Sequence, residues 1–458
     1  MEVTTGFLEK YNTQGPRYTS YPPATSFKTG MAANGFINAV KESNRSKPVN
    51  ISIYIHIPFC TQRCFFCGCN TTLFESDEKI SRYIHCLKKE IETVAEHIEK
   101  NRLVTQVHWG GGTPNSINLH HVQDVMGLLR ERFTFADYCE VAMECNPAYL
   151  GFKDIDQLSV TGFNRLSLGI QDFHENVLAA INRRPPLNDI GATIKYLKEK
   201  GFEGVNIDLV YGLPLQTKES FSENILKAVK TDADRVVTFS YAHIPWFNPE
   251  QNKISASSLP GAGEKLAMLV DAFNTFTANG YINIGMDHFA KPGDELSMAK
   301  ASHSLHRNFQ GYCTKKTTGQ VYAFGSSAIS QLSNCYAQNI KLLDKYMSSI
   351  ESTGLALERG YFLSDDEKLI GDIINEIMCN GYVNFESMAE KHITTVQHIF
   401  KITRFEQSKL DMFIADNLLS FDGNTLNVSP GGMLIVRNIA MVFDPTVTIS
   451  TNRHSQTI

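Results

Sequence analysis

Four cysteines stand within ten residues of this chain, and their spacing is well suited to chemistry. Cys60, Cys64 and Cys67 follow a C-x3-C-x2-C pattern, and Cys69 comes two residues later. Three thiolates on one loop can each bind one iron of a 4Fe-4S cluster, which leaves the fourth iron open for a small molecule. Structural metal sites fill their ligand positions, so an open iron predicts a reaction centre.

Two other interpretations of these cysteines remain open. A zinc knuckle would use Cys69 as its fourth ligand, although closed zinc sites usually take two separated Cys-x2-Cys pairs. Free core thiols seldom crowd so closely. Disulfides are not expected, because ten cysteines in 458 residues is a low density and the N-terminus lacks the basic and apolar stretches of a signal peptide. We therefore expect a reducing, cytoplasmic setting.

Composition excludes several functional classes. The chain is 42% hydrophobic and 20% charged, which is typical of a globular protein with a sizeable core. No apolar run approaches the length that spans a membrane. The net charge of −5 gives no sign of nucleic-acid binding through bulk charge. A length of 458 residues leaves room for two to four domains.

Strands and helices alternate through the middle of the chain. Isoleucines at 51, 53, 55 and 57 alternate with more polar residues, which predicts a strand that delivers the cysteine loop. Further strands are predicted at 104–109, 139–144, 165–169, 205–211, 236–242 and 281–285, with helices at 78–100 and 119–132. This order indicates an α/β fold with a parallel sheet and outer helices. In βα barrels the carboxyl ends of the strands build the active site. The polar, cysteine and glycine residues at these ends are Cys60, Gly110, Glu144, Gln171, Tyr211, His243, Asp287 and His288.

The two ends of the chain have sequence patterns that differ from the alternating strands and helices of the middle. Residues 1–48 carry turn signals such as Gly15-Pro16 and are predicted to be an arm laid over the rest. Residues 49–360 would form the barrel domain. Residues 361–458 predict helices at 366–379, 384–390, 395–401 and 406–417, followed by a hairpin. This mainly helical domain resembles a winged helix without an evident basic recognition helix, so a lid or packing role is favoured.

Several motifs together carry a family resemblance. The cysteine loop followed by Trp109-Gly-Gly-Gly-Thr-Pro114 resembles the radical S-adenosylmethionine superfamily, in which the glycines let the backbone approach the ligand. Six more segments sharpen the resemblance, to the oxygen-independent coproporphyrinogen III oxidase (dehydrogenase) family, over about residues 15–445. They are Arg17-Tyr-Thr-Ser-Tyr-Pro22, Tyr54-Ile-His-Ile-Pro-Phe-Cys60, Gly162-Phe-Asn-Arg-Leu-Ser-Leu-Gly-Ile-Gln-Asp172, Asn206-Ile-Asp-Leu-Val-Tyr-Gly-Leu-Pro214, Gly285-Met-Asp-His-Phe-Ala-Lys-Pro292 and His306-Arg-Asn-Phe-Gln-Gly-Tyr312.

The resemblance implies a fold and a reaction. The fold would be an incomplete (β/α) barrel of the radical S-adenosylmethionine type, with an N-terminal arm and a mainly helical C-terminal domain. The reaction would turn two propionates of coproporphyrinogen III into vinyls in haem biosynthesis, giving protoporphyrinogen IX. A 5′-deoxyadenosyl radical would remove hydrogen from each propionate β-carbon, and CO2 would leave. The chain would act as a monomer and take electrons from a flavodoxin- or ferredoxin-like donor, and the electron acceptor is not named by the sequence.

The resemblance also assigns residues. It places the 4Fe-4S cluster on Cys60, Cys64 and Cys67. It places two molecules of S-adenosylmethionine against Tyr54, Gly111, Gly112, Thr113, Glu144, Gln171, Arg183, Asp208, Ala242 and Ile329. The residue types agree, because carboxylates suit hydroxyl and amine groups and arginine suits a carboxylate. Without the resemblance, Tyr54 could equally be an ordinary strand tyrosine and Arg183 a solvated arginine.

Other roles stay open. Cys69 is a candidate for substrate handling or electron exit, and a plain structural thiol is the alternative. Arg17, Lys291 and Arg307 are candidate propionate ligands, because a tetra-anionic substrate needs positive partners. A haem chaperone or a haem-degrading radical enzyme is the alternative function. The arm and the Cys67-Gly-Cys69 extension argue against the first, and the 308–312 segment argues against the second.

Overall fold

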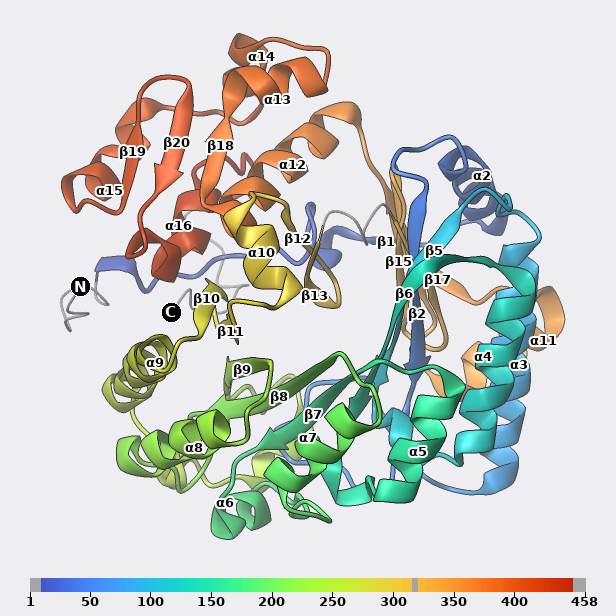
Figure 1. Cartoon of the computed structure of the whole chain (residues 1–458). Coiled ribbons are helices and arrows are strands. Elements are labelled where there is room, and N and C mark those ends of the chain that lie inside the picture. The colour runs from blue at the N-terminus through green and yellow to red at the C-terminus, as the bar shows by residue number, and fades with distance from the viewer. Residues whose placement is uncertain (1–9, 315–319, 448–458) are drawn as a thin grey trace.

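A curved sheet forms the centre of the molecule, and the computed structural model describes residues 10–314 and 320–447 around it (Figure 1). The parallel part runs in the order β14, β2, β5, β6, β7, β8, β9. These strands are β14 (Val321–Phe324), β2 (Asn50–Ile57), β5 (Leu103–Gly111), β6 (Thr134–Cys145), β7 (Arg165–Gln171), β8 (Gly204–Tyr211) and β9 (Arg235–Ser240). The parallel strands of the α/β prediction are therefore confirmed up to β9.

Antiparallel strands extend the sheet at both ends. Next to β14 come β15 (Ile329–Gln331), β16 (Cys335–Asn339), β17 (Leu357–Phe362) and β1 (Lys28–Thr29). Next to β9 come β11 (His288–Ala290) and β10 (Ile282–Gly285). The two edge strands, β1 and β10, do not pair with each other within residues 10–314 and 320–447. The sheet is thus an incomplete barrel, as predicted.

One predicted barrel strand is wrong. We expected 281–285 to continue the parallel series, but β10 and β11 form an antiparallel hairpin, and β11 pairs antiparallel with β9. Only Met286 and Asp287 lie between Gly285 and its partner His288, so there is no room for the crossover that parallel pairing requires. Strand β9 also ends at Ser240, which places Ala242 in a loop.

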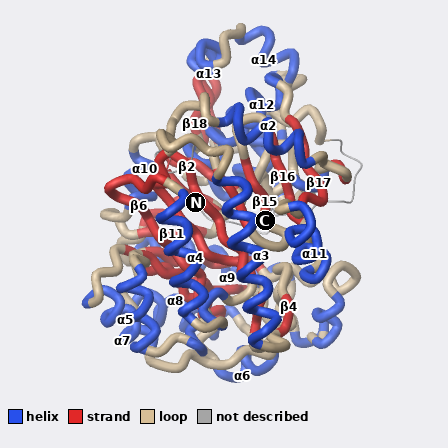
Figure 2. The backbone as a smooth tube through the Cα atoms, turned by 90° about the vertical axis from the view of Figure 1, so that its right-hand side faces the viewer, coloured by secondary structure: helices blue, strands red, loops and turns tan. Residues whose placement is uncertain are grey.

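Helices cover the outer face of the sheet (Figure 2). They are α3 (Asp77–Ala95), α4 (Leu119–Arg132), α5 (Phe152–Thr161), α7 (Ile190–Glu199), α8 (Lys218–Lys230) and α9 (Ala262–Ala278). Ser76 begins α3 by accepting a hydrogen bond from the N–H of Lys79, with two acidic residues in the first turn. The helix ends at Ala95, five residues before the predicted end.

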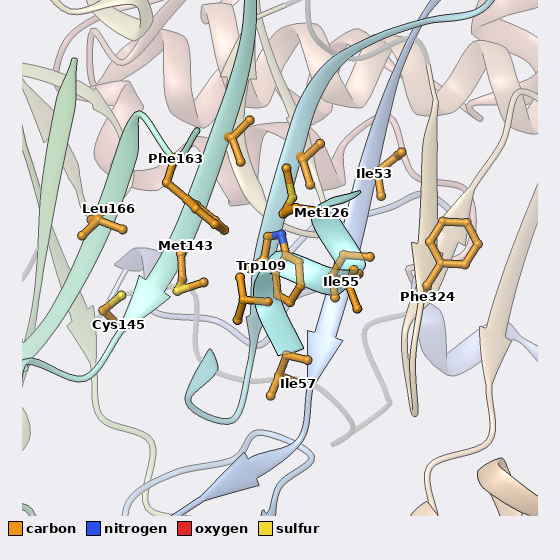
Figure 3. Packing of buried hydrophobic residues seen from close by; sticks show 14 of the residues in the cluster. Ile53, Ile55, Ile57, Trp109, Met126, Met143, Cys145, Phe163, Leu166 and Phe324 are labelled. Atoms are coloured by element: carbon orange, nitrogen blue, oxygen red, sulfur yellow. The ribbon is translucent and has the colours of Figure 1, made fainter. Parts of the chain in front are cut away.

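The period-two pattern of β2 separates the core from the barrel interior. Ile53, Ile55 and Ile57 are at most 1% exposed and pack beside the fully buried Trp109 of β5 (Figure 3). Alternate residues must point to the other face. Tyr54 therefore faces the interior, and the register of β2 and β5 sets it opposite His108.

A second core lies in the C-terminal part (Figure 1). It contains α12 (Asp365–Asn380), α13 (Phe385–Lys391), α14 (Val396–Ile402), α15 (Asp411–Ala415) and α16 (Val436–Met441), with a small sheet of β18 (Tyr382–Asn384), β20 (Thr425–Val428) and β19 (Leu419–Phe421). The predicted helices and hairpin are confirmed, except that 406–417 forms a short 3-10 turn and α15. Strand β18 was not predicted.

The N-terminal arm is divided between the two cores. Tyr11, Tyr18 and Tyr21 are buried in the C-terminal core, and the Tyr18 hydroxyl donates to Asp444 at 3.0 Å. The 6%-exposed Arg437 donates to the carbonyl of Pro16 at 3.1 Å. Further along, β1 pairs with β17, and α2 (Ala33–Ser43) packs on the barrel core. The arm therefore bridges both parts and is not a separate cover.

The helices differ from membrane-spanning segments in length or composition. In the part of the chain that the structure describes, none is both long and apolar enough to cross a bilayer.

The arm's tyrosines should contribute to stability as core residues do. We expect Tyr18→Ala to lower the free energy of unfolding of the C-terminal part by about 3 kcal/mol, since truncating a buried aromatic leaves a cavity. Tyr138→Ala, at a tyrosine that is 52% exposed, is the matched control. Urea unfolding monitored by hydrogen exchange of the α12 amides measures this difference. Equal changes in the free energy of unfolding in the two variants would contradict the prediction.

Candidate active site

The cysteine loop begins at the carboxyl end of β2. Strand β3 (Phe59–Cys60) pairs with β4 (Thr72–Leu73) and closes the loop at its base, and the N–H of Phe74 donates to the carbonyl of Cys60 at 2.9 Å. Inside the loop, the N–H of Cys67 donates to the carbonyl of Cys64 at 3.2 Å. These bonds fix three of the four cysteines on one short turn, as the sequence predicted.

Each candidate cluster thiol has its own polar neighbour. The Cys60 sulfur lies 3.3 Å from the Thr113 hydroxyl. The Cys64 sulfur accepts a hydrogen bond from the Arg183 guanidinium at 3.4 Å. The Cys67 sulfur accepts one from the main-chain N–H of Cys69 at 3.4 Å. Three donors thus stabilise negative charge on three neighbouring sulfurs.

The thiols differ in acidity. Burial raises the pKa of Cys60 to about 11 and also raises that of Cys64, although Arg183 opposes the shift at Cys64. The hydrogen bond from the Cys69 side chain lowers the pKa of Cys67 to about 6. The same interaction raises the pKa of Cys69, so Cys67 is the more acidic thiol of this pair. Metal binding would have to displace the protons of the Cys60 and Cys64 thiols.

The donor set fits a polynuclear cluster. Across residues 10–314 and 320–447, no three His, Cys, Asp or Glu side chains are grouped as ligands of a single metal ion. A 4Fe-4S cluster bonds each thiolate to a different iron, so its cysteines surround the cluster and do not converge on one point. Cys60, Cys64 and Cys67, with cationic Arg183 and Arg63 nearby, satisfy that need.

The glycine run at the end of β5 is packed against the strand that carries the cysteines. Gly111 has a φ of +114°, and a Cβ there would lie 2.6 Å from the His56 ring. A Cβ on Gly112 would lie 2.7 Å from the carbonyl oxygen of Pro58. Only glycine fits both positions. The N–H groups of Gly112 and Thr113 donate to Ile57 at 2.8 Å and to Phe59 at 2.9 Å.

A polar wall lies on the interior face beside the glycines. His108 contacts Glu144 at 3.0 Å, and the N–H of Gly111 donates to the same carboxylate at 3.4 Å. Burial opposes the charge of Glu144, but the hydrogen bond and charge of His108 and the N–H of Gly111 together outweigh it, so the pKa of Glu144 is lowered. Burial likewise opposes the charge of His108, but the bond and charge of Glu144 raise its pKa. Tyr54 stacks on His108 with its ring 6.0 Å away. The Glu144 side chain is still 45% exposed, so its carboxylate can reach a ligand.

Asp208 occupies the next position along the interior. Ser167 donates to one carboxylate oxygen at 2.9 Å, and Asn206 donates to the other at 2.8 Å. Burial raises the pKa of Asp208 to about 6, and the charge of Glu144 adds to the shift. Asp208 and Glu144 therefore share one electrostatic environment and can bind separate polar groups of the same ligand.

The remaining candidate cofactor ligands do not all lie together. Gln171 and Arg183 lie together over Gly169, where an added Cβ would be 2.7 Å from Gln171 and 3.2 Å from Arg183. The carbonyl of Ala242 accepts a hydrogen bond at 3.2 Å from Gln251, which also donates to Phe66 in the cysteine loop. Ile329 begins β15, two strands from β2 along the sheet.

Two findings revise the candidate substrate residues. Lys291 pairs with Asp232 at 2.5 Å and with Asp234 at 3.9 Å, so it belongs to a partly exposed ion cluster and the suggestion of a propionate ligand is wrong. Arg307 lies beside the arm and donates to the carbonyl of Arg17 at 3.0 Å. Sequence reasoning did not single out His108, although its position opposite Tyr54 follows once the strand register is known.

Known proteins match this arrangement over nearly the whole chain. The radical SAM superfamily, named for S-adenosylmethionine, matches residues 54–228. The oxygen-independent coproporphyrinogen III oxidase of Synechocystis is 38% identical over 97% of this chain and 95% of its own, and that of Escherichia coli is 39% identical over 95% and 94%. This chain belongs to the oxygen-independent coproporphyrinogen III oxidase family. The solved Escherichia coli coproporphyrinogen III oxidase, described as a radical SAM enzyme, has a TM-score of 0.88 at 37% identity and covers 95% of this chain and 100% of that one.

Membership of this oxidase family decides between the functions considered above. The family's name supports an oxidoreductase with a 4Fe-4S cluster and S-adenosylmethionine as cofactors. The haem chaperone and the haem-degrading enzyme have no support from these relatives. The cysteine spacing and the TM-score also favour the iron–sulfur interpretation over the zinc knuckle.

Loss of a single cluster cysteine should remove the iron. After anaerobic reconstitution we expect about four irons in the wild type and in Cys69→Ser, and almost none in Cys60→Ala, Cys64→Ala or Cys67→Ala, because each of these thiolates binds its own iron. Iron and sulfide analysis measures this. Cys335→Ala, at a buried cysteine in β16, is the matched control. A Cys69→Ser variant as poor in iron as Cys64→Ala would make Cys69 a ligand.

The binding of S-adenosylmethionine should depend on the charge of Asp208. Its carboxylate is ionised above a pKa of about 6 and is protonated below it. We expect affinity to fall as pH drops through about 6, and Asp208→Asn to bind weakly at every pH, by thirtyfold or more, since a lost charged partner costs roughly 2–5 kcal/mol. Isothermal titration between pH 5 and 8 checks this, with the exposed Asp365→Asn as control. The same pH dependence in Asp208→Asn would rule Asp208 out.

Proposed function

We propose that this chain catalyses the oxygen-independent oxidative decarboxylation of coproporphyrinogen III to protoporphyrinogen IX. The observation that carries the proposal is that relatives with this name match almost end to end, while the chain keeps the cysteine loop, glycine run and interior carboxylates in one site. Each of two propionates would become a vinyl group with loss of CO2.

The cofactors would bind along the carboxyl edge of the sheet. Cys60, Cys64 and Cys67 would hold the 4Fe-4S cluster. When it is bound with S-adenosylmethionine, that cluster supplies the electron that releases a 5′-deoxyadenosyl radical. The assigned contacts would hold two molecules of S-adenosylmethionine, as the family resemblance implies.

The chain's own residues would orient the cofactor and keep water away. Glu144 offers a charged acceptor to the amino group of S-adenosylmethionine, and the glycines at 111 and 112 hold this carboxylate beside the cysteine loop by packing closely on His56 and Pro58. Asp208 offers an acceptor for ribose hydroxyls. Arg183, held between Cys64 and Gly169, suits a carboxylate. Cys69 donates to Cys67 and is placed for a role in electron or proton handling.

A group of guanidiniums supports an anionic substrate. Arg17 and Arg307 lie close to Arg437, and burial together with the charges of these two neighbours lowers the pKa of Arg437 to about 10. The Arg307 guanidinium also lies 5.3 Å from the centre of the Tyr312 ring. Four propionate carboxylates need positive partners. This seam between the arm, the β12 (Leu305–Asn308) and β13 (Gly311–Thr314) hairpin, and α16 is the proposed propionate site.

The setting agrees with this chemistry. All ten cysteines of the chain are unpaired, which suits a reducing compartment, and we place the protein in the cytoplasm. A monomer would suffice, because one chain supplies every assigned residue. A flavodoxin- or ferredoxin-like donor would provide the electrons.

Substrate binding through Arg307 should be separable from the radical chemistry. Under anaerobic turnover, Arg307→Ala is expected to raise the KM for coproporphyrinogen III about tenfold or more, since a charged hydrogen bond is worth roughly 1.5–3 kcal/mol. Arg307→Lys should recover part of this loss. Cleavage of S-adenosylmethionine without substrate should be unchanged.

The control is Arg45→Ala, at an exposed arginine beyond α2. Protoporphyrinogen formation is measured by chromatography after oxidation of the porphyrinogens. A wild-type protein that consumes no coproporphyrinogen III would refute the function, and an unchanged KM in Arg307→Ala would refute the role of Arg307.

A further inference from the structure

Two adjacent aromatic side chains project into solvent beside the cysteine loop. Trp246 is 82% exposed and Phe247 is 77% exposed, more than any other Trp, Phe or Tyr side chain in the described ranges. Scattered apolar residues on a surface are common, but two neighbouring large aromatics expose an unusually large apolar area, which is unfavourable in water. They indicate a surface that another molecule covers.

The segment that carries these aromatics is fastened to the cysteine loop. Asn248, the next residue after Phe247, donates from its side chain to the carbonyl of Cys67 at 2.7 Å. Gln251 donates to the carbonyl of Phe66 at 3.2 Å. The exposed pair is therefore connected to Cys67, a proposed cluster ligand, through the adjacent Asn248 and its hydrogen bond.

Cations surround the same loop. The Lys253 ammonium lies 5.1 Å from the centre of the Phe65 ring, and its side chain is 55% exposed. Arg63, 37% exposed, lies within the loop, and the exposed Arg184 follows closely after Asn182, whose side chain donates to the carbonyl of Arg63 at 2.8 Å.

The acid Glu250 pairs with two of these cations. It pairs with Lys253 at 2.7 Å and with Arg63 at 3.7 Å. Three positive side chains against one carboxylate make this patch basic, while the whole chain carries a net charge of −5. A basic patch on an acidic protein favours an acidic partner, because complementary charge steers association.

We propose that Trp246 and Phe247, with Arg63, Arg184 and Lys253, form the docking surface for the protein that delivers electrons to the cysteine loop. The partner is an acidic carrier of single electrons. This inference rests on the proposed function, in which the loop holds an iron–sulfur cluster. The carrier is oxidised by one electron, and the electron passes to the cluster and reduces it.

The location suits electron delivery better than substrate entry. The interior side of the loop faces Thr113 and the glycine run, which belong to the cofactor site. The docking surface meets the loop at the main chain of the half-buried Cys67, through Asn248. A carrier seated there would come close to the cluster without entering the barrel.

The experiment uses the reconstituted holoenzyme with flavodoxin as the probe and dithionite as a small reductant. The variants are Trp246→Ser, Phe247→Ser and the charge reversal Lys253→Glu. Ile393→Ser, at a 95%-exposed side chain in the C-terminal part, is the matched control. Surface substitutions of this kind should leave folding intact, within about 0.5 kcal/mol.

We expect each variant to raise the Kd for oxidised flavodoxin about tenfold, with a similar rise in the flavodoxin concentration that half-saturates cluster reduction. Reduction by dithionite should be unchanged in all of them. Lys253→Glu should also make binding less sensitive to salt, because a rim charge sets that dependence.

Other results would overturn the inference. Equal flavodoxin affinity in wild type and variants, with normal dithionite reduction, would overturn the docking surface alone. So would failure of both flavodoxin and a ferredoxin to bind the wild type, or a wild-type dimer that the variants abolish, since the aromatics would then cover a second copy. A wild type in which dithionite reduces no iron–sulfur centre would refute the proposed function together with this inference.

Discussion

The close contact between the ends of β2 and β5 is the constraint on which the site depends. Gly112 and Thr113 hydrogen-bond the backbone on either side of Pro58, directly before Cys60. A Cβ on Gly111 or Gly112 would collide with His56 or Pro58. This contact fixes the start of the cysteine loop relative to Glu144, because Gly111 also donates to that carboxylate. One backbone junction thus sets the spacing between the candidate cluster loop and the carboxylate of Glu144.

The rest of the molecule closes the space beside this junction. In the described residues the edge strands β1 and β10 do not pair, and the β12–β13 hairpin and the C-terminal core lie on the open side of the sheet (Figure 1). The arm joins the two through the Tyr18 and Arg437 contacts at one end and the β1–β17 pairing at the other. The arm therefore holds the barrel and the C-terminal core together at the seam that carries Arg307, where we propose that the propionates bind.

The features of this structure that depend on local sequence patterns were predicted better than those that depend on long-range contacts. The limits 119–132 match α4 at both ends, and the alternating isoleucines gave β2 almost to the residue. The β10–β11 hairpin was missed because strand direction depends on pairing and cannot be read from apolar pattern. The role of Arg437 lay beyond reach because its partners are more than 400 residues away. Lys291 was misassigned for the same reason, since only the fold reveals Asp232 beside it.

The central claim is that this site removes hydrogen from the propionate side chains of coproporphyrinogen III. The most direct measurement is one anaerobic turnover with substrate deuterated at the propionate β-carbons, followed by mass spectrometry of the nucleoside product. The account predicts that each vinyl group formed is accompanied by one molecule of 5′-deoxyadenosine that carries one deuterium. Vinyl formation with unlabelled 5′-deoxyadenosine, or cleavage of S-adenosylmethionine that never depends on this substrate, would contradict it.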